Sequence, residues 1–375
     1  MEKRLDFIID IPNDIREIQS AFKARGFELF LVGGCVRDSF LGLEPKDWDL
    51  VTNALPDKII ELLKNENFVT KILETGKAFG VINVITKNDE FEIATMRKDV
   101  GIGRRPESVI FTDIQTDILR RDLTINALFY DIETSEIVDL VGGLDDLSQG
   151  IIRTVGLAED RFGEDRLRIL RAIRFAARFG SNLDEDIINA LKKNSSLEGI
   201  SSERIRDEFL KGIKTAKSVR RFMRLLREFN LVGQIFLSDL YVNTFVGTTK
   251  DPILVLGQML RKNTSDVLKT TLNSLSYTTD EIKAIIFLSN IKVVHGFDVI
   301  QLKKEQKHSG LTKEQIREFA RLIGIDGVFI DLFLEFELSV TGGQVMALTG
   351  AKPGPELGRM INEIEVVRFL DLAEA

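Results

Sequence analysis

The sequence predicts an α+β protein whose N-terminal region contains a small mixed sheet with helices and whose remainder is helical. Short apolar runs rich in β-branched and aromatic residues lie between turn residues in the first third of the chain, a pattern typical of strands. From Arg161 onward, apolar residues recur at intervals of three and four positions, which is the spacing of one helix face. A chain of 375 residues exceeds the usual size of one hydrophobic core, so we expect two or more domains.

The N-terminal elements are expected in a definite order. A helix over residues 15–25 leads into the apolar strand 28–32 and the turn Gly33–Gly34, and a second helix begins near Val36. Further strands are predicted at three apolar runs, residues 81–85, 91–96 and 108–111. A Gly-Gly turn before a helix is most often only a tight turn. It also places backbone N–H groups where a triphosphate could bind.

The composition is that of an ordinary globular protein, with 44% hydrophobic and 29% charged residues. Because no run of about 18 apolar residues occurs, we expect no membrane span. The N-terminal residues mix acids into their apolar stretch, which is not typical of a signal peptide. The single cysteine, Cys35, excludes a disulfide partner within the chain and fits a reducing cytoplasm. We therefore expect a cytoplasmic protein.

The charges are unevenly distributed along the chain. The net charge of −7 on its own argues against a nucleic-acid partner. Residues 151–230, however, contain 18 Lys and Arg against 12 Asp and Glu, a local excess of six positive charges. Phosphates respond to such a local basic surface rather than to total charge. Composition alone leaves both an RNA-binding surface and a solvated helical surface open.

Two acids stand two positions apart at Asp47 and Asp49. On an extended strand, residues i and i+2 project from one face, about 6.6 Å apart along the chain. Both carboxylates can then reach two metal ions about 3.5–4 Å apart, the separation used for in-line phosphoryl displacement. The alternative is a pair of surface acids on an edge strand.

The segment 33–52, GGCVRDSFLGLEPKDWDLVT, resembles the signature of the class II tRNA nucleotidyltransferase and poly(A) polymerase family. That resemblance implies a polymerase-β-like head in which Asp47 and Asp49 are catalytic and bind Mg2+. It also implies nucleotide contacts from Gly33, Gly34 and Arg37. A third acid often lies on a neighbouring strand in this family, which makes Glu92 the candidate. An outward-facing acid on an alternating strand is the alternative for Glu92.

Residues 120–127, RRDLTINA, resemble a second motif of the same family. Adjacent arginines and an aspartate offer phosphate donors and an acceptor for a ribose hydroxyl in one place. The resemblance assigns Arg120 and Arg121 to the triphosphate and Asp122 to the 2′-hydroxyl. Asn126 is expected to brace the segment.

Residues 164–168, EDRLR, resemble the motif that selects the incoming base in this family. At i and i+3 on a helix, Asp165 and Arg168 would be neighbours on one face. Cytosine and adenine both present an amino donor beside a ring-nitrogen acceptor, and an aspartate acceptor beside an arginine donor complements both. A helical salt bridge is the alternative. Arg171 and Arg174 continue a similar face, either towards phosphates or into solvent.

The resemblance extends over most of the chain and implies four domains. These are a catalytic head (1–137), a neck with the nucleotide-selecting helix (138–213), a helical body (214–290) and a helical tail that binds tRNA (291–375). Gly142–Gly143 suits a hinge between head and neck. Ser201 or Ser202 is suited to cap a helix, and Pro355 to begin one.

The predicted activity is template-independent addition of CCA to tRNA lacking all or part of its 3′ CCA, from CTP and ATP, with release of pyrophosphate. Three alternatives stay open. A poly(A) polymerase shares the head but tends to carry basic extensions. A CC-adding enzyme lacks a working flexible loop, and the loop here, Arg97 to Pro106, is shorter than the usual form. A non-catalytic RNA-binding protein would not need all of the acids above.

Overall fold

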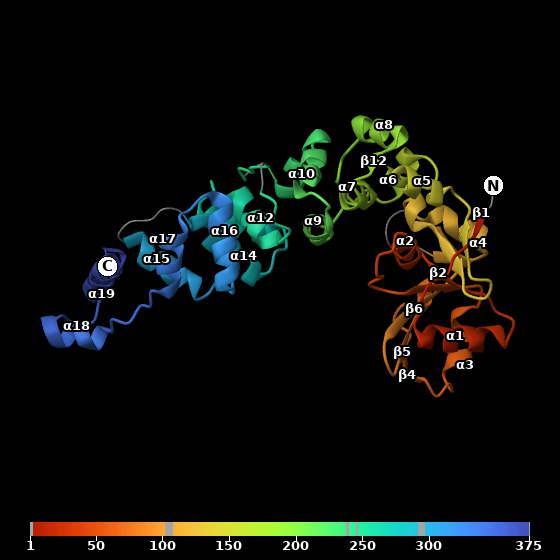
Figure 1. The fold of residues 1–375 in the computed structure, drawn as a ribbon, viewed down its shortest axis with the longest axis horizontal. Coiled ribbons are helices and arrows are strands. Elements are labelled where there is room, and N and C mark those ends of the chain that lie inside the picture. The colour runs from red at the N-terminus through yellow and green to blue at the C-terminus, as the bar shows by residue number, and fades with distance from the viewer. Residues whose placement is uncertain (1–2, 102–107, 238–239, 245–246, 292–296, 375) are drawn as a thin grey trace. The chain divides into compact units, whose positions relative to one another are not determined.

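The computed structural model describes residues 3–101, 108–237, 240–244, 247–291 and 297–374 (Figure 1). The chain divides into two compact units, Met1–Glu198 and Gly199–Ala375, here called the first and the second unit. The first unit contains the strands, and the second unit is helical in its described residues. The predicted α+β class, with a sheet-containing head followed by helices, is confirmed.

An eight-stranded mixed sheet forms the centre of the first unit, as far as the described residues show. In spatial order its strands are β1 (Lys3–Asp6), β10 (Glu136–Asp139), β9 (Phe129–Asp131), β2 (Leu29–Val32), β3 (Asp49–Thr52), β6 (Glu90–Thr95), β5 (Val81–Thr86) and β4 (Val69–Leu73). Neighbouring strands of this described sheet pair antiparallel, except for β3 and β6, which pair parallel. The strands predicted at residues 28–32, 81–85 and 91–96 correspond to β2, β5 and β6.

Both faces of the sheet are covered, as the alternation along β2 shows. Leu29 and Leu31 belong to one buried cluster, which also contains apolar residues of α1 (Asn13–Lys23) and α3 (Pro56–Leu63). Phe30 and Val32 belong to a second cluster. Figure 1 shows α1 and α3 lying together beside the strands. One face of the sheet therefore packs against α1 and α3, and the candidate site lies on the opposite face.

Several short elements surround the site. They are α2 (Gly34–Phe40), β7 (Arg97–Val100), β8 (Ser108–Phe111), α4 (Ile114–Asp117), and the 3-10 turns η1 (Lys77–Phe79), η2 (Ile118–Arg120) and η3 (Thr124–Asn126). The strands β7 and β8 pair antiparallel in a separate small sheet. The first part of the predicted flexible loop is therefore a strand, because the apolar run 108–111 gives it a pairing partner. Residues 102–106 of that loop lie outside the described residues.

The rest of the first unit is helical with two short strands. Its elements are α5 (Gly143–Gln149), β11 (Ile151–Ile152), α6 (Ala158–Glu164), α7 (Leu167–Phe179), β12 (Asn182–Leu183) and α8 (Glu185–Lys193). Because β11 and β12 pair in parallel, the predicted all-helical character of residues 138–213 is wrong in detail. The chain also leaves the helical conformation at Asp165, whose φ of −150° and ψ of 106° are extended.

The second unit continues the predicted helical pattern. Its helices are α9 (Ser202–Thr215), α10 (Val219–Glu228), α11 (Val232–Phe236), α12 (Pro252–Leu260), α13 (Ser265–Ser274), α14 (Thr279–Asn290), α15 (Phe297–Gln306), α16 (Lys313–Ile323), α17 (Gly327–Glu335), α18 (Gly342–Thr349) and α19 (Pro355–Glu374). Ser201 occupies the predicted N-cap position of α9, although its side chain makes no capping hydrogen bond among the described residues, and Pro355 begins α19 as predicted. None of the helices in the described parts of the chain is long and apolar enough to cross a membrane.

Candidate active site

The predicted catalytic acids lie at the start of β3 and on its parallel neighbour β6. Asp49 is the first residue of β3, and its register partner on β6 is Glu92. Asp47 precedes the strand by two residues. Trp48, between the two aspartates, is partly buried against the cluster on the α1 and α3 side. Leu50 and Ile93, which follow Asp49 and Glu92, belong to that same cluster, so both acids project from the opposite face.

The charges at this face repel one another. Desolvation raises the pKa of Asp49; Arg121 acts in the opposite direction, and Asp47 raises the pKa further. Desolvation also raises the pKa of Glu92, and the charge of Asp49 adds to that effect. Carboxylates that disfavour one another's charge form a site that a cation would stabilise.

The donor set is small. Among the described residues, no group of three or more His, Cys, Asp or Glu side chains is placed to hold a metal ion. One or two carboxylates are nevertheless sufficient for Mg2+, because this ion usually completes its octahedron with water and substrate phosphates. The oxygen donors of Asp47 and Asp49 therefore fit a hard divalent cation that binds together with a triphosphate.

The predicted phosphate-binding turn is more constrained than its sequence indicates. Gly33 has a φ of +77°, and its amide already donates to the carbonyl of Leu128 at 2.9 Å. A Cβ atom at this position would lie 3.3 Å from the carbonyl oxygen of Asn126. Gly33 is therefore required where β2 passes close to the segment 124–128. The predicted nucleotide contacts of Gly33 and Gly34 stay predictions.

Arg37 lies in the interior, with only 3% of its surface exposed. Its guanidinium pairs with Asp38 at 2.8 Å and donates to the amide oxygen of Asn126. It also lies over the rings of Phe175 and Phe179, 5.0 and 5.2 Å from their centroids. All three nitrogens of the Arg37 guanidinium contact protein groups in this structure. The predicted direct contact of Arg37 with a nucleotide stays a prediction.

Arg120 and Arg121 share one buried acid that the sequence analysis did not single out. Asp117 accepts from both guanidiniums, at 2.8 and 2.9 Å, and from the backbone N–H of Arg97. Burial acts to raise the pKa of Asp117, but Arg121 and Arg120 lower it below its ordinary value. Arg120 and Arg121 follow Asp117 by three and four residues, the helical spacing of ion pairs, and this spacing could have identified Asp117 from the sequence. Asp117 thus orients both arginines, and Arg121 also influences Asp49.

Asp122 is held by groups from two parts of the chain. It accepts from Nε of Arg171 at 2.6 Å, from Nδ2 of Asn126 at 3.2 Å and from the backbone N–H of Leu123 at 2.8 Å. Although burial acts to raise its pKa, the ion pair with Arg171 and these hydrogen bonds lower it to about 2. Asn126 therefore braces the segment, as predicted. Asp122 is a fixed, ionised acceptor at neutral pH.

Asp165 and Arg168 do not share one helix face, so that part of the prediction is wrong. Asp165 lies between α6 and α7, where its carboxylate accepts from the backbone N–H of Leu167 at 3.1 Å. Such local side-chain bonds compete with a continuous helix. The two residues still adjoin, because the N–H of Arg168 donates to the carbonyl of Asp165 at 3.0 Å. The guanidinium of Arg168 pairs with Glu164 at 2.6 Å.

Arginines recur along α7, as predicted, and each contacts protein groups, although the Arg171 side chain is 35% exposed. Arg171 pairs with Asp122, and Arg178 pairs with Asp38 at 2.8 Å. Arg174 is 8% exposed and lies over the ring of Phe175, 4.2 Å from its centroid. The predicted contacts of Arg171 and Arg174 with phosphates stay predictions.

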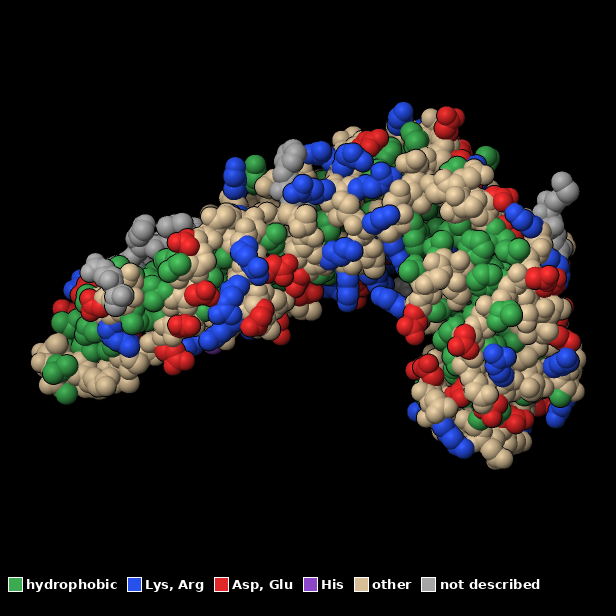
Figure 2. All heavy atoms as spheres, in the orientation of Figure 1, with side chains coloured by type: hydrophobic (Ala, Val, Ile, Leu, Met, Phe, Trp, Pro, Cys, Tyr) green, Lys and Arg blue, Asp and Glu red, His purple; other side chains and the backbone are tan. Residues whose placement is uncertain are grey.

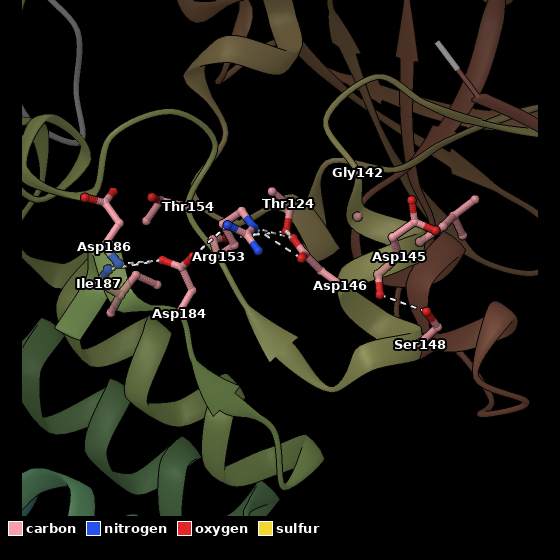
Figure 3. Close-up of polar contacts among 12 residues, drawn as sticks. Thr124, Gly142, Asp145, Asp146, Ser148, Arg153, Thr154, Asp184, Asp186 and Ile187 are labelled. Carbon is pink, nitrogen blue, oxygen red and sulfur yellow. Dashed lines mark hydrogen bonds and ion pairs between the residues drawn. The ribbon is translucent and has the colours of Figure 1, made fainter. Parts of the chain in front are cut away.

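A polar network ties the segment 124–126 to the helices that follow it (Figure 3). Thr124 donates to Asp146 of α5 at 2.6 Å, and Arg153 bridges Asp146 and Asp184 at 3.2 and 2.6 Å. Asp184 also caps α8 by accepting from two backbone N–H groups. The segment 124–126 is thus joined to α5 by one hydrogen bond, and α5 is joined to the start of α8 by the guanidinium of Arg153.

The Gly142–Gly143 pair meets a steric requirement. Gly142 has a φ of +82°, and a Cβ atom on Gly143 would lie 2.3 Å from the carbonyl oxygen of Thr124. The backbone of α5 therefore approaches the segment 124–126 at a distance that only glycine permits. Asp139 accepts from four successive backbone N–H groups at this point. The predicted hinge role stays a prediction.

Two family models match the chain. Residues 29–153 match the poly A polymerase head domain, and residues 180–239 match a probable RNA and SrmB-binding site of polymerase A. A CCA-adding enzyme of Streptococcus agalactiae is 31% identical, over 96% of this chain and 94% of the relative. One of Lactobacillus delbrueckii subsp. bulgaricus is 32% identical, over 95% and 93%. The chain belongs to the family of CCA-adding enzymes.

Solved structures of the family share its fold. A Bacillus stearothermophilus CCA-adding enzyme in complex with CTP matches with a TM-score of 0.73 and 24% identity, over 96% of both chains. A Thermotoga maritima CCA-adding enzyme complexed with tRNA matches with a TM-score of 0.66 and 21% identity, over 96% of this chain and 92% of that one. These likenesses confirm the predicted fold.

Membership of the CCA-adding enzymes confirms the predicted activity class. The chain is a tRNA nucleotidyltransferase acting in CCA addition, and a divalent metal ion is required by this family. The alternative of a non-catalytic RNA-binding protein is therefore wrong.

Proposed function

We propose that this chain adds C, C and A in turn from CTP and ATP to the 3′ end of tRNA lacking its CCA, with Asp47 and Asp49 holding two Mg2+ ions. The observation that carries this proposal is the alignment of Asp49 with Glu92 across β3 and β6, beside Arg121. When bound there, the metal ions would supply Lewis acidity for the attacking 3′-hydroxyl and charge neutralisation for the departing pyrophosphate. Oxygen donors favour Mg2+ over softer metals.

Arg120 and Arg121 are proposed to orient the triphosphate. Buried Asp117 holds both arginines, whose side chains are 21% and 15% exposed. An arginine held by a buried carboxylate keeps further N–H donors for phosphate oxygens in a fixed direction. Of these two arginines, Arg121 acts on the acids, since its charge partly offsets the desolvation that raises the pKa of Asp49.

Asp122 is proposed to accept a hydrogen bond from the 2′-hydroxyl of the ribose. A carboxylate offers about four lone-pair sites, and the described residues occupy three of them. The remaining site is available to one hydroxyl donor. Because the pKa of Asp122 is lowered to about 2, the group is an ionised acceptor at neutral pH.

Asp165 and Arg168 are proposed to read the base edge. Within the described residues, Arg168 uses three of its N–H groups, on Glu164 and on the carbonyls of Arg161 and Arg120. Two of its five donors, including Nε–H, are left for a ring nitrogen. A bidentate contact of this kind discriminates by about 1–3 kcal/mol. Cytosine and adenine match the pair, whereas uracil and guanine present the reverse pattern.

The second unit is proposed to contact tRNA through a basic surface on α10. A hollow of about 740 Å3 is lined by four arginines of this helix: Arg220, Arg221, Arg224 and Arg227. Figure 2 shows Lys and Arg side chains gathered over α9 and α10. Phosphate contacts from such a surface position an RNA without reading its sequence. The match of residues 180–239 to an RNA-binding model supports this role.

The four-part division into head (1–137), neck (138–213), body (214–290) and tail (291–375) is proposed to describe functional regions of this chain. We also propose a cytoplasmic location. The buried thiol of Cys35, whose pKa is raised to about 11 by desolvation, supports a protein that works reduced and without disulfides.

One observation favours a second candidate, a CC-adding enzyme. Part of the short loop Arg97 to Pro106 is the strand β7, so fewer residues are left to act as a flexible loop. The test is to incubate the enzyme with tRNA lacking CCA, supply CTP and ATP singly and together, and sequence the 3′ ends. Termination after CCA supports the proposal. Termination after CC supports the second candidate, and long A tracts would show poly(A) polymerase activity.

A further inference from the structure

A chain of polar contacts runs through the interior of the first unit, from Asp38 and Arg37 on α2 to Asn126 and Asp122. At its start, Oδ1 of Asp38 accepts from Nε of Arg37 and pairs with its Nη2, both at 2.8 Å. Oδ2 of Asp38 pairs with Nη2 of Arg178 on α7 at 2.8 Å. Asp38 and Arg37 are only 5% and 3% exposed. One buried carboxylate thus holds two guanidiniums from different helices.

Arg37, held in place by Asp38, in turn orients the side-chain amide of Asn126. With Nε and Nη2 held by Asp38, its Nη1 donates to the amide oxygen of Asn126. A guanidinium has donors and no acceptor, so this bond fixes which end of the amide faces Arg37. The amide nitrogen must then point the other way, where it donates to Oδ1 of Asp122 at 3.2 Å.

Two aromatic rings restrict Arg37 further. Its guanidinium lies 5.0 Å from the ring centroid of Phe175 and 5.2 Å from that of Phe179, and the two rings stack with an interplanar angle of 13°. Cation–π contacts of this kind favour one placement of a planar cation. The direction of Nη1 is therefore determined on one side by Asp38 and on the other by α7.

We propose that Asp38 is a positioning residue for ribose selection: by fixing Arg37 it makes Asn126 present its amide nitrogen to Asp122, which keeps the Asp122 carboxylate aimed at the 2′-hydroxyl. The proposal rests on the ribose role proposed above for Asp122. Without the charge of Asp38, Arg37 loses its anchor and the amide of Asn126 is able to turn. The amide oxygen would then oppose a carboxylate, and Asp122 would shift.

The test is the ratio of kcat/KM for CTP to that for 2′-deoxy-CTP, measured for Asp38→Asn together with thermal unfolding. We expect the ratio to fall by roughly threefold to tenfold, the effect of weakening one charge-assisted hydrogen bond. Asp14→Asn is the matched control. Asp14 is an equally buried aspartate, 5% exposed, that accepts from Thr86 and Asn88 on the other side of the sheet. This control should lose stability and keep the ratio.

A double-mutant cycle separates positioning from a general effect on folding. If Asp38 acts through Asn126, adding Asp38→Asn to Asn126→Ala should lower the ratio no further than Asn126→Ala alone. Should Asp38→Asn fail to fold, Arg178→Gln removes the outer cation, which is 21% exposed, and leaves the Arg37–Asp38 pair in place. That variant should lower the ratio by about twofold, with the same dependence on Asn126.

The outcomes distinguish this inference from the ribose role on which it rests. If Asp122→Ala and Asn126→Ala lower the ratio while Asp38→Asn and Arg178→Gln leave it unchanged, the positioning role is wrong and the ribose role stands. If Asp122→Ala leaves the ratio unchanged, the ribose role fails and this inference fails with it. The inference is supported if Asp38→Asn lowers the CTP to 2′-deoxy-CTP ratio and Asp14→Asn does not. It also requires that Asp38→Asn lowers the ratio no further when Asn126→Ala is already present.

Discussion

The acids of the first unit fall into two groups with opposite electrostatics. On β3 and β6, desolvation raises the pKa of Asp49 and of Glu92 above its ordinary value. A neighbouring carboxylate adds to each shift, Asp47 for Asp49 and Asp49 for Glu92. In the segment beside them, Asp117 and Asp122 are each paired with arginines, and the pKa of each lies below its ordinary value. This contrast shows which acids already have their charges balanced by protein groups. The segment that we propose to orient the nucleotide is already held by ion pairs, whereas the proposed catalytic acids form the part of the site that a cation would stabilise.

The largest expected effect is the loss of activity in Asp49→Asn. We expect kcat/KM to fall by about 10²–10³-fold or more, because the carboxylate that holds the metal ions is removed. Stability should not fall, since the raised pKa of Asp49 means that its charge is unfavourable in the folded protein. Single-nucleotide incorporation and thermal unfolding measure both. Retained activity with a lower Tm would reverse the roles assigned to the two groups.

Asp122→Asn should show the opposite pattern in stability. A folded pKa of about 2 against an ordinary value of 3.8 corresponds to about 2 kcal/mol of stability at neutral pH. Because the folded pKa is depressed, this contribution is fully present above pH 4 and is lost as the pH falls towards 2. Urea unfolding of wild type and variant at pH 7 and pH 3 checks it. If the difference in unfolding free energy between wild type and Asp122→Asn is as large at pH 3 as at pH 7, the ion pair of Asp122 with Arg171 does not stabilise the protein.

Glu92→Gln should reduce activity less than Asp49→Asn does. We expect a fall of roughly tenfold, the effect of removing one supporting carboxylate, accompanied by a higher Mg2+ concentration at the half-maximal rate. Titration of the rate with Mg2+ measures this. A loss as large as that of Asp49→Asn would place Glu92 among the primary metal ligands. No loss would leave it as an outward-facing acid of β6.

The smallest expected effect is that of Glu164→Gln. The pair between Glu164 and Arg168 is 38% exposed on the acid side, so its removal should change stability by less than about 0.5 kcal/mol. Discrimination against UTP should be kept, because Asp165 and Arg168 remain. Misincorporation of UTP in competition with CTP is the readout. A strong loss of discrimination would show that Glu164 itself is part of the base-reading group.

The sequence predicted the parts of the fold that depend on local apolar patterns. The strands β2, β5 and β6 have buried or alternating apolar residues between turns, and α1 has its apolar residues at helical spacing. The strands β1 and β7, KRLD and RKDV, were missed because such charged segments carry no alternation. Their strand conformation depends on pairing with β10 and β8, which local sequence does not encode.

In the candidate site, the sequence indicated which residues to propose as chemically active but not which groups hold them. The partners of Asp122 and Asp38 on α7, Arg171 and Arg178, lie 49 and 140 residues away along the chain. No local pattern predicts which arginine of a stripe meets which acid. The interruption at Asp165 was missed for a related reason. The apolar spacing continues through it, while a single side-chain bond to the N–H of Leu167 decides the backbone.

The most direct test of the difference between the two groups of acids is the binding of Mn2+, as a paramagnetic probe for Mg2+, in the presence of a non-hydrolysable CTP analogue. Electron paramagnetic resonance would follow the free ion in titrations of wild type, Asp49→Asn and the control Asp14→Asn. The account predicts tight binding that needs the triphosphate, is kept in Asp14→Asn and is lost in Asp49→Asn. Equal binding in wild type and Asp49→Asn would contradict it.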